Sequence, residues 1–376
     1  MKMRFPCSRI QVVGFGLLIL LGLVGGCGKD DPMPDCTDCD LTGIPYAPTA
    51  YVVNVPADFP QMEIPADNPM TVEGVELGRR LFYDKRLSAD STMACASCHL
   101  PEFGFTDDMA FSKGVDGLFG KRSSMSLTNI GFNYYGLFWD GRSATLEEQA
   151  LLPVEDPIEL HEEWPNVIQK LVRDDQYPVW FRQAFGISDK REITKELAAK
   201  AIAQFERTLI SGNSRYDALF IRVEDFPTED EQLGYDLFFD FEPAVPDAEC
   251  GHCHGSVLLT TNNYFNNAID SVGNLNEFKD LGRGAVTGNY LDNGRFRAPT
   301  LRNIALTAPY MHDGRFATLE EVIDHYDSGG HVAENYDANM HPLKLTEKQK
   351  QALIALLHTM TDTSFVQNPA FQDPWK

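Results

Sequence analysis

The sequence predicts a mainly α fold in which two related helical units carry long ordered loops. Strand-like alternation of polar and apolar residues is scarce along the 376-residue chain, which favours helices. Three landmarks also recur in the same order in the two halves. They read LGRRLFYD (77–84) and LGYDLFFD (233–240), SLTNI (126–130) and TLRNI (300–304), and WDGRSATLEE (139–148) and HDGRFATLEE (312–321). This ordered recurrence indicates an internal duplication.

The first landmark of each half has the apolar spacing of an amphipathic helix. Within residues 74–84, Leu77, Leu81 and Phe82 share one face, and residues 229–239 repeat the pattern. We therefore expect one helix at the start of each unit.

Further helices are indicated by capping signals and by apolar periodicity. Thr145 and Thr318 are each followed at the third position by glutamate, as in a capping box. Residues 194–211 predict a long amphipathic helix, and residues 346–349 (TEKQ) open a last one. The residues expected to face inward in these two helices are Ala198, Ile202, Phe205, Leu209, Leu353, Ile354 and Leu357.

Each unit carries a Cys-x-x-Cys-His motif, CASCH at 95–99 and CGHCH at 250–254. This spacing is the attachment signature of c-type haem, in which two thiols bind the haem covalently and the histidine ligates its iron. A structural zinc site would need four convergent ligands, and neither motif has an evident partner pair. We predict two cytochrome c-type haem domains. The two haem c groups would be held by Cys95, Cys98 and His99, and by Cys250, Cys253 and His254.

The first 26 residues are typical of a lipoprotein signal peptide. Lys2, Arg4 and Arg9 precede an apolar stretch at 12–24 that is too short for a confident membrane span. The stretch ends in LVGGC, which resembles a lipobox with Cys27 as the lipidated residue. We therefore expect an exported protein, in the periplasm or cell envelope, attached to a membrane through lipid on Cys27.

The chain after the signal peptide divides into three parts. Residues 27–55 are polar and contain prolines, as in a flexible tether. Cys36 and Cys39 lie there without a following histidine, so a small disulfide or free thiols are expected rather than a haem. Residues 56–215 would form the N-terminal domain and residues 216–376 the C-terminal domain, with the boundary near 212–230.

The chain is strongly acidic. It has 32 basic and 55 acidic residues, and removal of residues 1–26 leaves 29 basic residues and a formal charge of −26. Such a charge disfavours nucleic acid as a partner. It would attract a basic electron-donor protein, although solubility alone would explain it equally well.

These motifs together resemble the bacterial di-haem cytochrome c peroxidases, including their MauG-type branch, which oxidises tryptophan to make tryptophan tryptophylquinone. The likeness spans residues 60–365 and depends on both haem motifs, FWDGR (138–142), LEEQA (146–150) and PTLRNIALTAPY (299–310). The resemblance implies two cytochrome c domains that face each other. The N-terminal haem would handle peroxide, and the C-terminal haem would pass electrons.

The resemblance assigns catalytic roles in the N-terminal unit. Glu159 matches the family's catalytic glutamate, which moves a proton between the peroxide oxygens. A solvated surface carboxylate is the alternative, because this region is rich in acidic residues. Gln149 matches a glutamine of the same pocket. Trp139 matches a tryptophan between the two haems that relays electrons, although a tryptophan here would also serve as a core residue.

One departure from many family members concerns the distal side of the N-terminal haem. They carry a histidine after the motif, where this chain reads FSKGVDGL (111–118), and His161 is the only other histidine of the N-terminal half. We therefore expect an open, five-coordinate haem, as in the MauG-type branch.

The sixth ligand of the C-terminal haem stays open between three residues. Tyr326 falls where peroxidases have methionine and the MauG-type branch has tyrosine, and Met340 and Met311 are alternatives. A tyrosinate would lower the reduction potential, and a methionine thioether would raise it. His312 matches a histidine near the haem edge, with a structural role as the alternative.

A calcium ion often lies between the haems in this family. Thr307 and Pro309 match the carbonyl positions that bind it, and Ser123 stands where asparagine is usual.

Three functions compete at this point. The first is a peroxidase that reduces hydrogen peroxide with electrons from a small periplasmic donor, a cytochrome c or a cupredoxin. The second is a peroxide-dependent oxidase that modifies a protein substrate. The third is a non-catalytic di-haem electron carrier, against which Glu159 and the missing distal histidine argue. A homodimer is expected as well.

Overall fold

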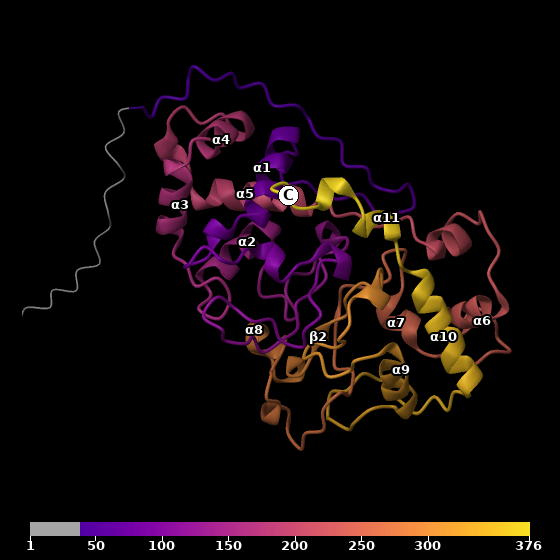
Figure 1. Ribbon diagram of the computed structural model, residues 1–376. Helices are drawn as coiled ribbons and strands as arrows, with labels where there is room; N and C mark the ends of the chain where they lie inside the picture. Colours follow the sequence, from indigo (N-terminus) through magenta and orange to yellow (C-terminus); the bar gives the residue numbers. More distant parts are fainter. Residues whose placement is uncertain (1–37) are drawn as a thin grey trace, which may run out of the picture. The chain divides into compact units, whose positions relative to one another are not determined.

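The computed structural model describes residues 38–376 as a helix-rich protein (Figure 1). The predicted signal peptide, Cys27 and Cys36 lie outside the described residues. Within the described part, the only sheet is an antiparallel pair in which β1 (Tyr264–Phe265) lies beside β2 (Phe296–Arg297). The prediction of a mainly α fold is therefore confirmed.

The helices follow one another along both halves. The α-helices are α1 (Val72–Tyr83), α2 (Leu146–Glu155), α3 (Trp164–Arg173), α4 (Tyr177–Phe185), α5 (Lys195–Glu206), α6 (Glu229–Phe239), α7 (Cys250–His254), α8 (Gly284–Thr287), α9 (Leu319–Ser328), α10 (Glu347–Thr359) and α11 (Thr363–Val366). The π-helix η6 (Asp217–Ile221) follows α5. Short 3-10 turns are η1 (Lys85–Leu87), η2 (Cys95–Ser97), η3 (Pro101–Phe103), η4 (Ile130–Phe132), η5 (Lys190–Glu192), η7 (Leu275–Glu277), η8 (Tyr290–Asp292), η9 (Ile304–Leu306) and η10 (Pro369–Phe371).

In each half, the first helix packs closely on the last. α1 approaches α5 where Gly78 lies directly on the carbonyl of Ala201, and a Cβ at Gly78 would overlap that oxygen. α6 approaches α10 in the same way, with Gly234 on the carbonyl of Ala352. Glycine at both crossings lets the helix backbones come into contact, which brings the apolar faces of the helices together.

The two largest hydrophobic clusters of the described residues lie at these helix crossings. The first contains Leu77, Leu81 and Phe82 of α1 together with Ala198 and its neighbours on α5. The second contains Leu237, Phe238 and the inner residues of α10. All seven residues predicted to face inward from the α5 and α10 regions are buried: Ala198, Ile202, Phe205, Leu209, Leu353, Ile354 and Leu357.

The predicted helix boundaries are close to those observed, with one exception. The helix predicted over 194–211 ends at Glu206, and Arg207 begins a turn that leads to Ser211. Leu209 remains buried although it is outside the helix. Apolar periodicity alone cannot distinguish a helix end from a buried turn.

The predicted N-caps at Thr145 and Thr318 are both observed, but they differ in completeness. The Thr145 hydroxyl accepts from the Glu148 backbone N–H at 3.1 Å, while the Glu148 carboxylate accepts from Ala144. At Thr318 the full reciprocal capping box with Glu321 is present. Thr346 forms a second complete box at the start of α10.

Residues 38–55, the second part of the predicted tether, lie against the N-terminal half. Leu41 is buried, and its N–H donates to Ser188 O at 2.9 Å. Tyr51 N–H donates to Met70 O at 3.0 Å. The segment is therefore attached to the folded chain at several points, although side chains such as Val52 stay exposed.

The end of the chain returns to the first helix. Phe365 and Phe371 belong to the first core, and the Tyr83 hydroxyl donates to Phe371 O at 2.6 Å. Arg79 of α1 donates to Gln372 O at 2.8 Å. In Figure 1, the yellow segment that follows α10 runs back toward α1 and α5.

A buried polar junction connects the two halves. Asn129 and Asn303 both adopt left-handed backbone conformations, at φ 58° and 64°. Asn129 exchanges hydrogen bonds with the backbone of Ser211, while Asn303 donates to the Ser211 hydroxyl and accepts from Asp362 N–H. Because buried amides require partners, this junction fixes the SLTNI and TLRNI landmarks beside one another.

Within residues 38–376, no helix combines the length and the apolar character that a membrane span requires.

Candidate haem sites and the region between them

The N-terminal motif places two thiols and one imidazole at a tight turn. Cys95 and Cys98 are free thiols, and Cys98 N–H donates to Cys95 O at 3.2 Å. His99 Nδ1 lies 2.8 Å from Phe105 O, so it donates there and leaves Nε2 as the lone-pair nitrogen. Burial lowers the pKa of His99, which keeps the ring neutral. This arrangement fits covalent haem with His99 as axial ligand.

The C-terminal motif repeats the arrangement on α7. His254 Nδ1 lies 3.1 Å from Pro299 O, which again leaves Nε2 free, and burial lowers the pKa of His254 to about 4. Cys250 and Cys253 are also free thiols. All three residues line a largely apolar cavity of about 170 Å³. A flat, apolar macrocycle requires such a lining, so this donor set also fits haem c.

Arg297 was missed in the sequence analysis, although it borders this cavity. It is 3% exposed, its Nη1 donates to Gly136 O at 2.7 Å, and its Nε has no hydrogen-bond partner. Burial lowers its pKa to about 10. A buried cation with an unpaired donor fits an anionic group in the cavity, such as a haem propionate. An arginine within the apolar stretch FRAP (296–299) was the available signal.

Glu159 lies beside the N-terminal motif. Burial gives the largest increase in the pKa values of Cys95 and Cys98, followed by the charge of Glu206 at Cys95 and of Asp107 at Cys98. The charge of Glu159 adds a smaller increase at both thiols. The Glu159 side chain is exposed, but the protein atoms packed around it partly desolvate the carboxyl group and raise its pKa to about 7. Asp156 raises this pKa further, and Arg142 lowers it.

The turn after α2 holds Glu159 in position. Glu159 N–H donates to Asp156 O at 3.0 Å, and its carbonyl accepts from Val115 N–H at 2.9 Å. Gly114 lies directly on the carbonyl of Ile158. The strip 111–118, where many relatives carry the distal histidine, is thus in direct contact with the segment that carries Glu159. Its side chain nearest this contact is Val115, which cannot ligate iron.

His161 contacts this strip through a carboxylate, which occupies one of its ring nitrogens. Its Nδ1 pairs with Asp116 Oδ2 at 2.5 Å, and both side chains are about half exposed. Gln149 lies in the second turn of α2 and is partly buried. Arg142, another residue the sequence analysis did not single out, stacks over the Phe138 ring at 3.4 Å.

Trp139 borders the C-terminal cavity and is hydrogen-bonded to a segment that reaches the N-terminal motif. Its indole Nε1 donates to Ser123 O at 2.9 Å. The next residue, Ser124, donates from its hydroxyl to Cys98 O at 2.7 Å. Trp139, Ser123 and Ser124 therefore form a short, continuous connection between the two candidate haem sites.

All three candidate ligands of the C-terminal haem line its cavity: Tyr326, Met311 and Met340. Asn267 Nδ2 lies 3.3 Å from Met311 Sδ and 3.5 Å from the Tyr326 hydroxyl, so these two side chains are neighbours. Burial raises the pKa of Tyr326 to about 12. The structure brings the three together without selecting one.

The region expected to hold calcium lies between the same segments. Ser123 donates from its hydroxyl to Met311 O at 2.9 Å and from its N–H to His312 O at 2.8 Å. His312 stacks on Phe296 with ring centroids 3.7 Å apart. Thr307 and Pro309 precede this contact along the same segment. The serine hydroxyl is thus already hydrogen-bonded to a backbone carbonyl.

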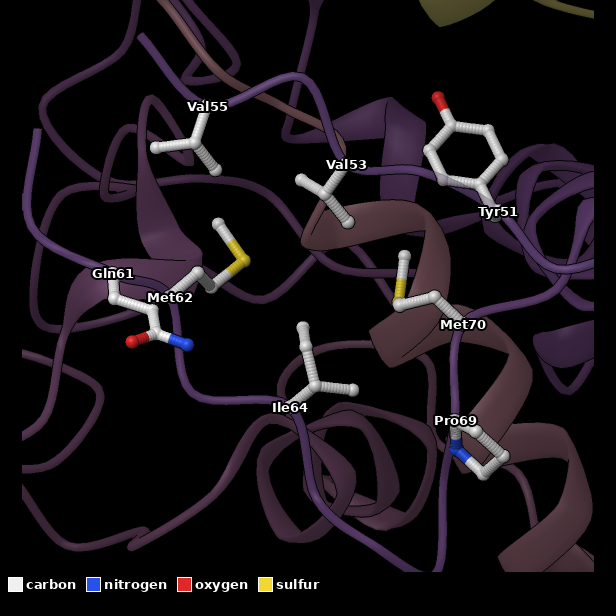
Figure 2. A pocket seen from close by; sticks show the side chains of 8 residues that line it. All are labelled: Tyr51, Val53, Val55, Gln61, Met62, Ile64, Pro69 and Met70. Carbon is white, nitrogen blue, oxygen red and sulfur yellow. The ribbon is translucent and has the colours of Figure 1, made fainter. Parts of the chain in front are cut away.

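A second pocket, of about 350 Å³, lies in the segment 51–70 (Figure 2). Valine, isoleucine, proline and methionine side chains form most of its wall, and Tyr51 is its only titratable residue. It offers no thiol, imidazole or carboxylate. Its lining therefore differs from that of the two Cys-x-x-Cys-His sites, which offer thiols and imidazoles.

Two haem-binding motifs on a helical scaffold with a carboxyl group beside the first define a multihaem c-type cytochrome. Comparison with known proteins gives the particular family. Residues 72–225 match the family described as Di-haem cytochrome c peroxidase. The chain is 32% identical over 327 residues to the methylamine utilization protein MauG of Methylophilus methylotrophus, covering 85% of this chain and 93% of the relative.

A peroxidase relative and a solved structure agree with this assignment. The cytochrome c551 peroxidase of Nitrosomonas europaea is 33% identical over 312 residues, which cover 81% of this chain and 85% of the relative. A solved MauG-like protein associated with microbial copper homeostasis is 38% identical, with a TM-score of 0.80, covering 87% of this chain and all of that one. The chain belongs to the di-haem cytochrome c peroxidase family, which makes it an oxidoreductase with two haem c groups.

Proposed function

We propose that this protein reduces hydrogen peroxide to water at the N-terminal haem, with electrons delivered through the C-terminal haem. Peroxide reduction is the chemistry for which the family's peroxidases are named. The observation that carries the proposal is the position of Glu159, whose charge reaches both thiols of the N-terminal motif. In the C-terminal site the charge of Glu249 likewise reaches both motif thiols, so the choice of the N-terminal haem depends on the match of Glu159 to the family's catalytic glutamate.

Glu159 would act as the acid–base group of the reaction. Each turnover consumes one peroxide, two electrons and two protons and yields two waters. The haem supplies the redox-active iron at which peroxide is reduced. With a pKa of about 7, Glu159 can accept a proton from one peroxide oxygen and return it to the other near neutral pH. Arg142 stabilises its ionised form, and Gln149 would orient peroxide beside it.

Trp139 would relay electrons between the haems. Its indole borders the C-terminal cavity, and Ser123 and Ser124 continue from it to Cys98. A short chain of hydrogen-bonded groups is a better path for electrons than an equal gap through space. The packing of Trp139 beside the cavity is compatible with this role.

An internal duplication into domains 56–215 and 216–376 would explain why the two sites resemble each other. Gly78 and Gly234 occupy equivalent helix crossings, and Asn129 and Asn303 share a left-handed conformation. Isolated antiparallel bridges Leu137↔Ser143 and Tyr310↔Phe316 also enclose the WDGR and HDGR turns. These correspondences support one ancestral haem unit that was copied.

The proposal is tested by steady-state turnover of the purified holoprotein. Hydrogen peroxide and a reduced small cytochrome c or cupredoxin are supplied, and oxidation of the donor is followed together with loss of peroxide. We expect two donor equivalents oxidised per peroxide and no need for prior reduction of the enzyme. Peroxide that disappears without donor oxidation would contradict the peroxidase assignment.

A peroxide-dependent oxidase of MauG type is the second candidate. Tyr326 lies in the C-terminal cavity beside Met311, and a tyrosinate ligand would lower the potential of that haem. The likeness to a MauG-like protein, at 38% identity, points the same way. This function predicts poor turnover with the small donor and a peroxide-dependent mass change in a partner protein encoded beside this chain.

The remaining expectations concern location and assembly. Periplasmic export fits haem c attachment, and we propose lipid on Cys27 as the membrane anchor. Calcium at Thr307 and Pro309 would stabilise the segment between the haems, and a homodimer would agree with the family pattern. Mass spectrometry of the mature N-terminus, metal analysis and sedimentation test these three points.

A further inference from the structure

A cluster of carboxylates and imidazoles lies at the side of the C-terminal haem motif. Asp247, Glu249 and His252 each offer one ligand atom, and these three atoms lie within 4.8 Å of one another. His252 Nε2 is 2.8 Å from Glu249 Oε2 and 3.4 Å from Asp247 Oδ2. His252 is one of the two residues between the haem-binding cysteines of α7, so the cluster borders the haem attachment itself.

A second imidazole comes from a distant part of the chain. His341 Nε2 lies 3.1 Å from Glu249 Oε1, the carboxylate oxygen that His252 does not contact. Glu249 is therefore held from both sides. In metal sites, partners of this kind orient a ligating carboxylate and keep its second oxygen free for the metal.

The two carboxylates lack a permanent positive partner. Their side chains are only 24% and 21% exposed, for Asp247 and Glu249, and histidines are the only basic groups that pair with them in the part of the chain described. The cluster thus brings together two partly exposed carboxylates that have no lysine or arginine beside them. Partly buried charges of one sign need a counter-charge, and a divalent cation would supply it.

We infer that Asp247, Glu249 and His252 bind a divalent transition metal, with His341 as the positioning residue for Glu249. Imidazole together with carboxylate suits Zn²⁺ and Cu²⁺, and such sites generally bind Cu²⁺ more tightly. The exposed His252, at 51%, leaves an open side through which the metal enters. This inference depends only on the haem at Cys250 and Cys253 and does not require the peroxidase activity.

Metal at this position would act on the adjacent haem. Glu249 lines the same cavity as Cys250 and His254. A positive charge there stabilises the reduced, less positive haem and so raises its reduction potential. The cluster would thereby couple the availability of a metal ion to the ease with which this haem accepts electrons.

The test titrates the untagged holoprotein with Zn²⁺ and with Cu²⁺. In the holoprotein the four motif thiols are consumed by haem and cannot bind the added metal. Calorimetry should give one tight site per chain, and the electron paramagnetic resonance spectrum of bound Cu²⁺ should show nitrogen coupling from imidazole. Zn²⁺ should raise the midpoint potential of the C-terminal haem and leave that of the N-terminal haem unchanged.

Three variants separate a built site from adventitious binding. His252→Asn should abolish tight binding and the potential shift, and His341→Asn should weaken binding by about 10–100-fold. His358→Asn, at an exposed histidine on α10, is the matched control and should bind as the unaltered protein does. Haem content, measured as the pyridine haemochrome, confirms that each variant is intact. Equal affinity in His252→Asn, or equal loss in His358→Asn, overturns the inference.

Discussion

The two haem-binding halves share a scaffold and differ in the side chains around it. Each has a close helix crossing at a glycine, an N-capped helix after the Asp-Gly-Arg turn, and a motif histidine whose Nδ1 donates to a carbonyl. Beside the first motif lie Glu159 and the apolar Val115, while the second faces Tyr326 and methionines. On the proposed function, these few side chains would give one half acid–base chemistry and the other half a ligand for its haem.

The largest effect is expected where the halves differ in acid–base chemistry. Glu159→Gln should keep both haems and lower peroxide turnover by about 10²–10⁴-fold, because the amide cannot shuttle a proton. Glu155→Gln, an exposed residue at the end of α2, should have near-normal activity. In the unaltered protein, turnover should change with an apparent pKa near 7, since Glu159 is ionised above that pH and protonated below it. Unchanged turnover in Glu159→Gln would remove this residue from the mechanism.

The next effect concerns the ligand of the second haem. If Tyr326 ligates, Tyr326→Phe should change the spin state of that haem and shift its potential by tenths of a volt, because axial ligands span about 0.8 V. Met340→Leu should then leave the spectrum unchanged. The reverse pattern would assign Met340, and no change in either variant would leave Met311 or a five-coordinate haem.

A third difference lies in the last helix of each half. Glu206 of α5 is 5% exposed, and its Oε2 has no partner, whereas α10 carries the exposed His358 at the same distance from its N-cap. Burial raises the pKa of Glu206 from 4.5 to about 8. Between these values only the folded state holds the proton, so the free energy of unfolding falls as pH rises through this window.

Glu206→Gln should therefore flatten the pH dependence of stability. At pH 7 the folded protein loses at most about 3 kcal/mol of stability by keeping Glu206 protonated, and the substitution removes this loss. Glu196→Gln, exposed on the same helix, is the control and should keep the slope. Urea unfolding of the holoprotein at pH 5, 7 and 8.5 gives the free energy of unfolding at each pH. A Glu206→Gln variant whose free energy of unfolding still falls as steeply with pH would contradict the interpretation.

The smallest effect compares the two caps. Thr318→Ala removes a complete capping box and Thr145→Ala a single cap bond, so both should lose about 1 kcal/mol, the former more. The melting temperatures of the two variants, measured by thermal unfolding, show which one loses more stability. A larger loss at Thr145 would mean that Glu148, through Ala144, contributes more than the reciprocal box does.

Patterns among residues close together in the sequence predicted much of this structure, whereas contacts between residues far apart in the sequence could not be predicted. The helices at α1, α6 and α10, the caps at Thr145 and Thr318 and both haem motifs follow from spacing that a few residues determine. The helix predicted over 194–211 was too long, because apolar periodicity continues through the turn after Glu206 as far as Leu209. The environment of Arg297 could not be predicted, since its partner Gly136 lies 161 residues away.

The same limit applies to the metal cluster. His252 lies within a haem attachment motif, so its sequence context does not indicate a further metal site. His341 is 92 residues from Glu249 in sequence and contacts it only in the folded chain. Tyr326, Met311 and Met340 also come from separate positions in the sequence, and only folding brings them to one cavity.

The return of the chain end to α1 has a consequence for biogenesis. Arg79 and Gln372 are bonded across 293 residues, and Tyr83 and Phe371 across 288. If the chain is exported from its N-terminus, as proposed above, Cys95 and Cys98 cross the membrane long before Phe371, which belongs to the first core. Haem would therefore be attached to the first motif while that core is still open, and the final dozen residues would act as the closing step of maturation.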